Sequence, residues 1–129
     1  MAPHVFVEPI CVASIEKAQQ AFESTDLPGR LAKYHRDARK TFYLWVDVWL
    51  DPEFLHWNIE EYLGGIDCPL LAIQGEDDEY GSMAQLEAIR RGVRGACELV
   101  KLKDCGHAPF RDQPEATLAA LGRFVQALA

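Results

Sequence analysis

Residues 69–78 read PLLAIQGEDD, and residues 105–109 read CGHAP. The first segment opens with a short continuous apolar run, which is typical of a strand buried on both faces of a parallel sheet. Residues 97–102 alternate more regularly and indicate a strand nearer the sheet edge. We therefore expect two strands, at residues 69–74 and 97–102. The first ends at Gly75 before an acidic loop, and the second ends shortly before Gly106 and His107.

A helix is predicted between these strands and another after them. Ser82 and Gln85 have the spacing of a capping box, and Gly92 and Gly95 can end the helix that follows. The last helix begins near Pro114. The apolar positions are Leu86, Ile89 and Val93 in the first helix and Leu118, Leu121, Val125 and Leu128 in the second. The order strand, helix, strand, helix implies parallel strands, with the last helix covering one face of the sheet.

Two chemically useful side chains lie just beyond the predicted strands. Asp78 is the third residue after Gly75, and His107 follows the second strand. Neighbouring strands lie about 4.8 Å apart and parallel strands end at the same edge, so we expect the two side chains to come within hydrogen-bonding distance. A carboxylate beside an imidazole is the acid and base of a catalytic triad. Asp77 is the nearest competitor for the acid, and a simple solvated loop at residues 76–79 is the alternative.

Residues 1–66 are predicted to be mainly helix and loop. Ser14 can cap a first helix, and a second helix begins near Asp37. This helix has an apolar stripe that stops at residues 51–52, with Phe42, Trp45, Val46 and Trp49. A third segment can begin there, with Phe54, Trp57, Ile59 and Leu63. Such a stripe is typical of a core face, but it can also wall a substrate pocket beneath a helical lid. In the second case Trp45, Trp49 and Trp57 contact an apolar or aromatic group of the substrate.

The composition narrows the class of protein. The 129 residues match one domain, and 49% of them are apolar, which is enough for a core. A formal net charge of −7 argues against binding to nucleic acid or an anionic membrane. No apolar run reaches the ~20 residues that span a bilayer and the first residues lack a signal-peptide pattern, so a cytoplasmic location is expected. The four cysteines form no C-x-x-C pair, and we expect neither a metal nor another cofactor.

The two segments, followed by DQPE at residues 112–115, resemble the C-terminal third of an α/β-hydrolase-fold enzyme. The likeness is clearest over residues 67–129, and residues 14–63 stand in the place of the family's helical cap. The resemblance implies a partial α/β-hydrolase fold, in which a cap segment at residues 1–66 precedes two parallel β-α units at residues 67–129. It also implies that His107 is the base and Asp78 the acid of a Ser-His-Asp type triad.

The nucleophile of such a triad is missing from the sequence pattern. Members of the family carry a G-x-S-x-G elbow and an oxyanion-hole loop on strands that would precede Met1. Ser14 and Ser82 are better explained as helix caps, and Ser24 lies in a polar stretch. Loss of a triad nucleophile costs on the order of a million-fold in kcat, so the chain alone is expected to be nearly inert.

Three hypotheses about function follow. The chain is a segment of a hydrolase that cleaves an ester, thioester, amide or carbon–carbon bond of a small molecule, and its missing half supplies the serine. Alternatively, it is a truncated, non-catalytic relative that acts as an interaction module, or a domain that binds a small ligand without chemistry. A sheet of two strands exposes an edge and apolar faces, so a symmetric homodimer joined through the strand edge or the cap stripe is also expected if no other half covers them.

Overall fold

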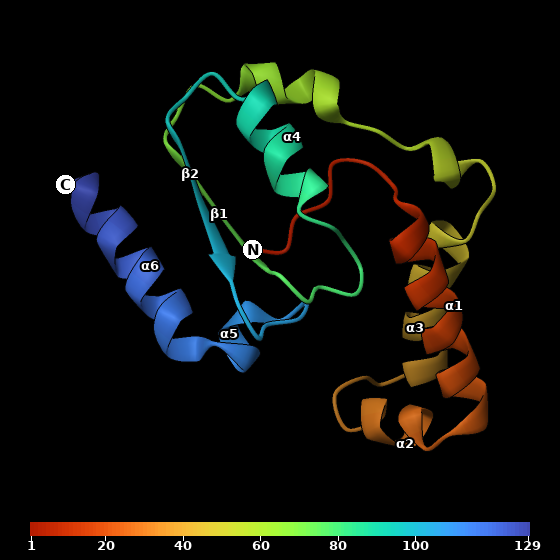
Figure 1. The fold of residues 1–129 in the computed structure, drawn as a ribbon. Helices are drawn as coiled ribbons and strands as arrows, with labels where there is room; N and C mark the ends of the chain where they lie inside the picture. The colour runs from red at the N-terminus through yellow and green to blue at the C-terminus, as the bar shows by residue number, and fades with distance from the viewer. The chain divides into compact units, whose positions relative to one another are not determined.

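The computed structural model describes residues 1–129, and the chain forms two compact units (Figure 1). One unit contains Met1–Phe6 and Asn58–Ala129, and the other contains Val7–Trp57. These divisions differ from the predicted boundary at residue 66. Val5 and Leu63 lie in a buried cluster with Ala88 and Ile89, so the segments on both sides of the helical unit pack with the C-terminal part of the chain.

The sheet consists of two parallel strands, β1 (Leu70–Gly75) and β2 (Cys97–Leu102). Leu70 lies opposite Cys97, and Gly75 lies opposite Leu102. Helix α4 (Ala84–Gly92) connects the two strands. The prediction of two parallel strands joined by a helix is therefore confirmed, and both strands end at the same edge of the sheet.

The two faces of the sheet carry different buried clusters. Leu71 and Ile73 of β1 point with Val100 and Leu102 of β2 into a cluster that contains Ala120. Leu70 and Cys97 pack on the other face, against the cluster that contains Ala88 and Ile89 of α4. This alternation follows from the two-residue period of a strand. It places α4 on one face and α6 (Pro114–Ala127) on the other (Figure 1).

Helix α6 meets the sheet through a different face from the predicted one. Thr117 and Ala120 are its buried residues, and the Thr117 hydroxyl donates a hydrogen bond to the Pro109 carbonyl at 3.0 Å. The side chains predicted to cover the sheet are instead exposed: Leu118 at 71%, Leu121 at 37%, Val125 at 62% and Leu128 at 54%. The buried face of α6 is the one with small side chains, because these let the helix lie close to the sheet. An apolar stripe consequently faces away from the sheet.

The N-terminal residues complete the first unit. The Ala2 amide donates a hydrogen bond to the Ile73 carbonyl at 2.8 Å, on β1. Gln85 of α4 is fully buried, accepting from the Val5 amide at 2.8 Å and donating to the Phe6 carbonyl at 3.0 Å. The short helices η2 (Glu60–Gly65) and α5 (Pro109–Asp112) belong to the same unit.

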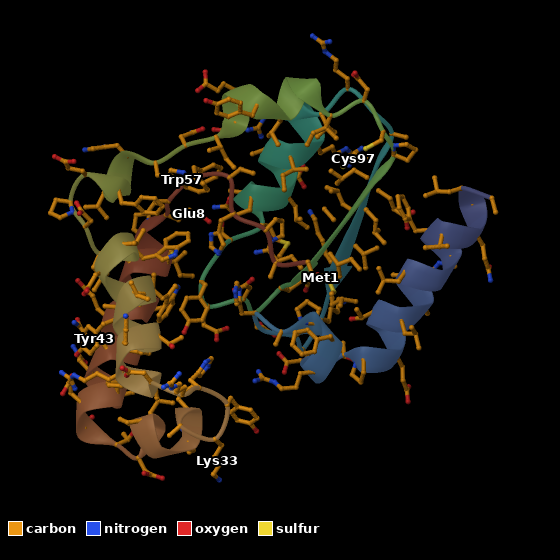
Figure 2. The ribbon with its side chains drawn as sticks, turned by 180° about the vertical axis from the view of Figure 1, so that it is seen from behind. Met1, Glu8, Lys33, Tyr43, Trp57 and Cys97 are labelled. Carbon is orange, nitrogen blue, oxygen red and sulfur yellow. The ribbon has the colours of Figure 1, made fainter.

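The second unit is helical (Figure 2), with α1 (Pro9–Ser24), α2 (Leu27–Leu31), α3 (Ala38–Trp49) and η1 (Phe54–His56). Helix α3 starts next to the predicted position, and Asp37 caps it by accepting from the Lys40 amide at 2.9 Å. The prediction that Ser14 caps the first helix is wrong, because α1 begins at Pro9, whose fixed φ suits the first turn. The core residues are Cys11, Ile15 and Phe22 of α1 with Phe42 and Val46 of α3.

None of the helices is long and apolar enough to cross a membrane.

Candidate functional site

The loops that follow β1 and β2 approach each other unusually closely, and Gly75 permits it. A Cβ added at Gly75 would lie 2.0 Å from the Cys105 carbonyl oxygen and 2.4 Å from that of Gly106. The Asp77 amide donates to the Cys105 carbonyl at 3.0 Å, which ties the two loops together. A glycine at the end of the first strand is thus what lets the second loop run beside the first.

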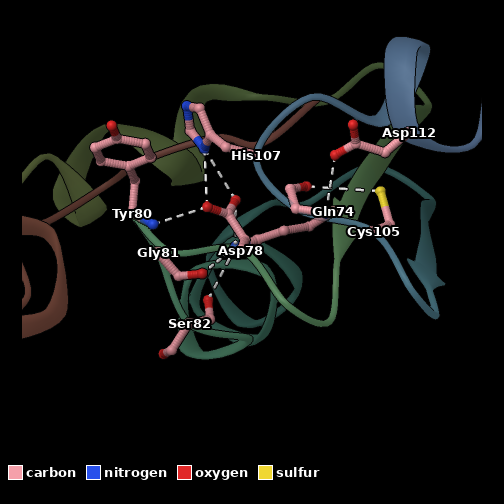
Figure 3. A network of polar contacts seen from close by, with 9 residues as sticks. Gln74, Asp78, Tyr80, Gly81, Ser82, Cys105, His107 and Asp112 are labelled. Carbon is pink, nitrogen blue, oxygen red and sulfur yellow. Dashed lines mark hydrogen bonds and ion pairs between the residues drawn. The ribbon is translucent and has the colours of Figure 1, made fainter. Parts of the chain in front are cut away.

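This approach pairs Asp78 with His107 (Figure 3). The imidazole Nδ1 lies 2.9 Å from Asp78 Oδ1 and 3.0 Å from Oδ2. The Tyr80 amide also donates to Oδ1, at 2.9 Å. Asp78 is only 5% exposed, whereas Asp77 and Glu79 are exposed. Of the adjacent acids, the structure therefore brings the predicted one to the imidazole.

The pKa of Asp78 is lowered and the pKa of His107 is raised, so the charged form of each group is stabilised. Burial acts to raise the pKa of Asp78, but the hydrogen bonds from His107 and the Tyr80 amide outweigh it, and the pKa lies below its usual value. The hydrogen bond to Asp78 raises the pKa of His107, against the opposing effect of burial and with help from the charges of Asp78 and Glu79. The carboxylate thus stabilises the imidazolium, as a triad acid does.

The remaining surroundings of His107 enclose its side chain only in part. With Nδ1–H directed at Asp78, the lone pair is on Nε2, and 39% of the His107 side chain is exposed. The rings of Tyr80 and His4 lie beside it, with centroids 4.9 Å and 5.8 Å away. A base in this arrangement can take a proton from a group that approaches Nε2. His4 thus packs beside the site, although it is far from His107 in the sequence.

The loop that carries His107 also forms hydrogen bonds with Asp112 and Gln113, which the sequence pattern did not single out. The Gly106 amide donates to the Asp112 carboxylate at 3.0 Å. Gln113 donates to the carbonyls of Lys103 and Asp104, at 3.2 Å and 3.1 Å. Asp104 has a φ of 50°, a left-handed conformation that needs such support in a residue other than glycine. These contacts fix the turn between β2 and His107.

Neither Cys105 nor Ser82 has the surroundings of a nucleophile. Cys105 is 1% exposed, and burial raises the pKa of its thiol, with further contributions from Asp112, Asp78 and Asp77. A reactive cysteine needs a lowered pKa. The Ser82 hydroxyl accepts a hydrogen bond from the Ala84 amide at 3.1 Å, at the start of α4. The site thus contains a carboxylate and an imidazole. The Cys105 thiol is buried in the core, and the Ser82 hydroxyl accepts a backbone hydrogen bond at the start of α4.

The three predicted substrate-binding tryptophans lie in the helical unit, where the structure brings two of them together. Trp49 and Trp57 have ring centroids 6.2 Å apart, and Phe54 lies between 5 and 6 Å from both, at 5.3 Å and 5.4 Å. Trp57 and Phe54 line a shallow hollow of about 400 Å³. Trp45 lies one helical turn before Trp49 on α3, edge-on to Phe42 at 5.7 Å. Their role in binding stays a prediction.

The pH dependence of the pair gives a first prediction. By NMR titration, His107 should have a pKa above the ordinary 6.5, and Asp78→Asn should lower it. Because the folded-state pKa of His107 is raised, its contribution to stability should be complete below pH 6.5 and lost as the pH rises through the raised value. That of Asp78 should be present above 3.8 and lost as the pH falls through its lowered pKa. A His107 pKa that is the same in Asp78→Asn as in the unaltered chain would contradict the pairing.

No protein-family model matches the chain, and no curated protein matches it either. Among solved structures it is similar to MGS-M2, an α/β-hydrolase enzyme from a Medee basin deep-sea metagenome library, with 19% identity and a TM-score of 0.59. That match covers 97% of this chain and 54% of the other. It is also similar to a membrane phospholipase A described as a bacterial virulence factor, with 23% identity, a TM-score of 0.60 and coverage of 93% and 40%.

These likenesses concern the fold. They confirm the predicted partial α/β-hydrolase fold, since nearly the whole chain matches but it spans only 54% and 40% of the two solved structures. In a parallel sheet, functional side chains gather beyond the carboxyl ends of the strands. Asp78 and His107 occupy that edge, after β1 and β2 respectively.

Proposed function

We propose that this chain carries the acid and base of a hydrolase whose nucleophile comes from a polypeptide segment outside the chain. The single observation that supports it most is the pair formed by buried Asp78 and His107 at the carboxyl ends of two adjacent parallel strands. The α/β-hydrolase fold of the solved structures that it resembles supports the same reaction class.

The proposed chemistry uses each nitrogen of the imidazole differently. His107 Nε2 takes the proton of a serine hydroxyl as the oxygen attacks the substrate carbonyl, and then gives it to the leaving group. Asp78 holds Nδ1–H at 2.9 Å, which fixes the tautomer and stabilises the imidazolium. The chain itself supplies no covalent step, so turnover needs the serine and the oxyanion hole of the other segment.

The helical unit is proposed to act as a lid over a small-molecule substrate. Its aromatic side chains, Trp49 and Trp57 with Phe54 among them, suit an apolar or aromatic group. One similar structure is called a phospholipase A, which makes a carboxylic ester the first substrate class to test. Ester, thioester, amide and carbon–carbon bond hydrolysis can all use the same acid and base.

The experiment for this proposal begins with the isolated chain. Purified alone, it should hydrolyse an activated ester no faster than an equal concentration of free imidazole, because an acid and base without a nucleophile are nearly inert. His107→Ala should leave that background rate unchanged. Release of p-nitrophenolate from p-nitrophenyl acetate and butyrate measures both rates.

Robust turnover by the isolated chain would refute the proposal. The variants Ser82→Ala and Cys105→Ala would then decide which side chain provides the nucleophile. Both are close to the site in sequence, and the expected result is that neither alters the background rate.

A second candidate function, self-association, is favoured by the exposed stripe on α6. Leu118, Leu121, Val125 and Leu128 have the 3-4-3 spacing of a helix–helix seam. Beside them, a Cβ added at Gly122 would meet nothing within 4 Å, so another helix can approach closely. We propose a second copy of this chain as the partner, with α6 packed against α6 about a two-fold axis.

Sedimentation at high micromolar concentration tests the self-association. The chain should be a dimer, and Leu121→Glu should make it monomeric, because two carboxylates would be buried at the centre of the seam. Gln126→Glu adds the same charge on another face of α6 and should leave the dimer intact. A compact monomer that binds no hydrophobic dye at that concentration would contradict the second candidate.

A further inference from the structure

Gln74 is a fully buried polar side chain next to the candidate site, and the proposed mechanism does not use it. It is the fifth residue of β1, in a segment whose other side chains are apolar, and it is 0% exposed. A buried amide normally forms hydrogen bonds with both its nitrogen and its oxygen. The Gln74 Oε1 atom has no hydrogen-bond partner. An unsatisfied buried carbonyl destabilises the folded chain, so the position of this side chain calls for an explanation.

The hydrogen bonds of the Gln74 side-chain nitrogen explain this position. Gln74 Nε2 lies 2.6 Å from the Gly81 carbonyl oxygen, 3.3 Å from Asp78 Oδ2 and 3.3 Å from the Ser82 carbonyl oxygen. All three neighbours are acceptors, so the nitrogen and not the oxygen must face them. The amide therefore connects β1 to both ends of the turn that carries the acid, as the dashed lines in Figure 3 show.

The carboxylate of Asp78 is consequently held on both oxygens. Oδ1 accepts from the Tyr80 amide at 2.9 Å, and Oδ2 faces the Gln74 amide at 3.3 Å. His107 Nδ1 lies almost equally far from the two oxygens, at 2.9 Å and 3.0 Å. Donors on either side thus fix the plane of the carboxylate relative to the imidazole. Tyr80 and Gly81 both donate through their backbone amides, so apart from His107 it is Gln74 whose side chain contacts this carboxylate.

We propose that Gln74 is a positioning residue, whose side-chain amide holds Asp78 and the turn after it in the orientation that receives the His107 Nδ1 hydrogen. Gln74 touches neither the imidazole nor, in the proposed mechanism, the substrate. It acts through Asp78. The inference rests on the proposed function only for its effect on turnover, because the orientation of the acid can be measured in the isolated chain.

Gln74→Met tests the role, since methionine has a similar length and volume but no donor. The titration of His107 is the readout, and the groups that face its ring are Asp78, Glu79, Tyr80 and His4. The substitution changes none of these groups. NMR titration should show the His107 pKa moving down toward its ordinary value, because a carboxylate that is free to rotate stabilises the imidazolium less.

The chain provides a matched control in Gln85, the other fully buried glutamine. Its side-chain amide bonds to the backbone of Val5 and Phe6, on the N-terminal segment. Gln85→Met should lower stability, as Gln74→Met should, but it should leave the His107 titration unchanged. If loss of any buried amide had the same effect, the His107 pKa would change in both variants or in neither. Either result would overturn the proposal.

A second measurement covers the case in which Gln74→Met does not fold. In the unaltered chain, the Gln74 side-chain NH₂ signals should be protected from hydrogen exchange, and their chemical shifts should follow the titration of the pair. NH₂ signals that exchange freely or ignore the titration would overturn the proposal. In an enzyme reconstituted with a nucleophile segment, Gln74→Met should lower kcat by up to about 100-fold with little change in KM. A shifted titration without any reconstituted turnover would refute the proposed function and leave the role of Gln74 standing.

Discussion

In an enzyme reconstituted from this chain and a nucleophile-bearing segment, His107→Ala is expected to lower kcat by about a million-fold. The imidazole is the only base placed to take the serine proton in the proposed mechanism, so its removal should cost as much as removal of the nucleophile itself. Asp78→Asn should lower kcat by about 10⁴-fold, because an amide at 2.9 Å from Nδ1 favours the wrong tautomer. The two effects should not add, since the residues act as a unit.

The adjacent acid Asp77 gives the control for these substitutions. Asp77→Asn removes the same charge one residue away, on an exposed side chain. It should change kcat by less than about tenfold, because exposed charges interact weakly with the site. An effect of Asp77→Asn as large as that of Asp78→Asn would mean that charge near the loop matters and the hydrogen bond to His107 does not.

The second large effect is expected for Gly75→Ala, which should destabilise the chain by about 3 kcal/mol. The added Cβ would lie 2.0 Å from the Cys105 carbonyl oxygen, and this neighbour is backbone that cannot rotate away. The two loops must separate, and the hydrogen bond between the Asp77 amide and the Cys105 carbonyl should be lost with them. Urea denaturation gives the free energy of unfolding.

Gly65→Ala is the matched control for Gly75→Ala. A Cβ added at Gly65 would meet no atom within 4 Å, so the substitution should change stability by less than about 0.5 kcal/mol. The His107 titration should also respond to Gly75→Ala and not to Gly65→Ala, because only the first substitution moves the acid loop away from the imidazole. Equal stability of both variants would show that the close approach of the loops is not required.

The core of the fold was predictable because several local signals agree. The apolar run before Gly75 and the alternation at residues 97–102 each predict a strand, and both strands form as expected. The face of α6 was predicted wrongly for a physical reason. Its larger apolar side chains are exposed, while Thr117 and Ala120 face the sheet, because sequence periodicity shows an apolar arc without showing which part of it is covered.

The pairing of Asp78 with His107 could also be predicted, because parallel strands bring the residues after their carboxyl ends together. The supporting residues could not. Asp112 and Gln113 reach the His107 loop through backbone hydrogen bonds that leave no pattern in the sequence. Gln74 did leave a signal, since a polar residue in a buried apolar strand needs a buried partner. His4 comes to the site through the N-terminal segment, whose path depends on the fold of the whole unit.

The central claim is that this chain supplies a working acid and base and that a separate segment supplies the nucleophile. Ester hydrolysis measured before and after addition of an N-terminal half that carries a G-x-S-x-G elbow tests it most directly. We expect no turnover above free imidazole before addition, and saturable turnover after it that disappears when the elbow serine is changed to alanine or His107 to alanine. Rapid hydrolysis by the chain alone, or a co-eluting complex that stays inactive or keeps its turnover without His107, would contradict the claim.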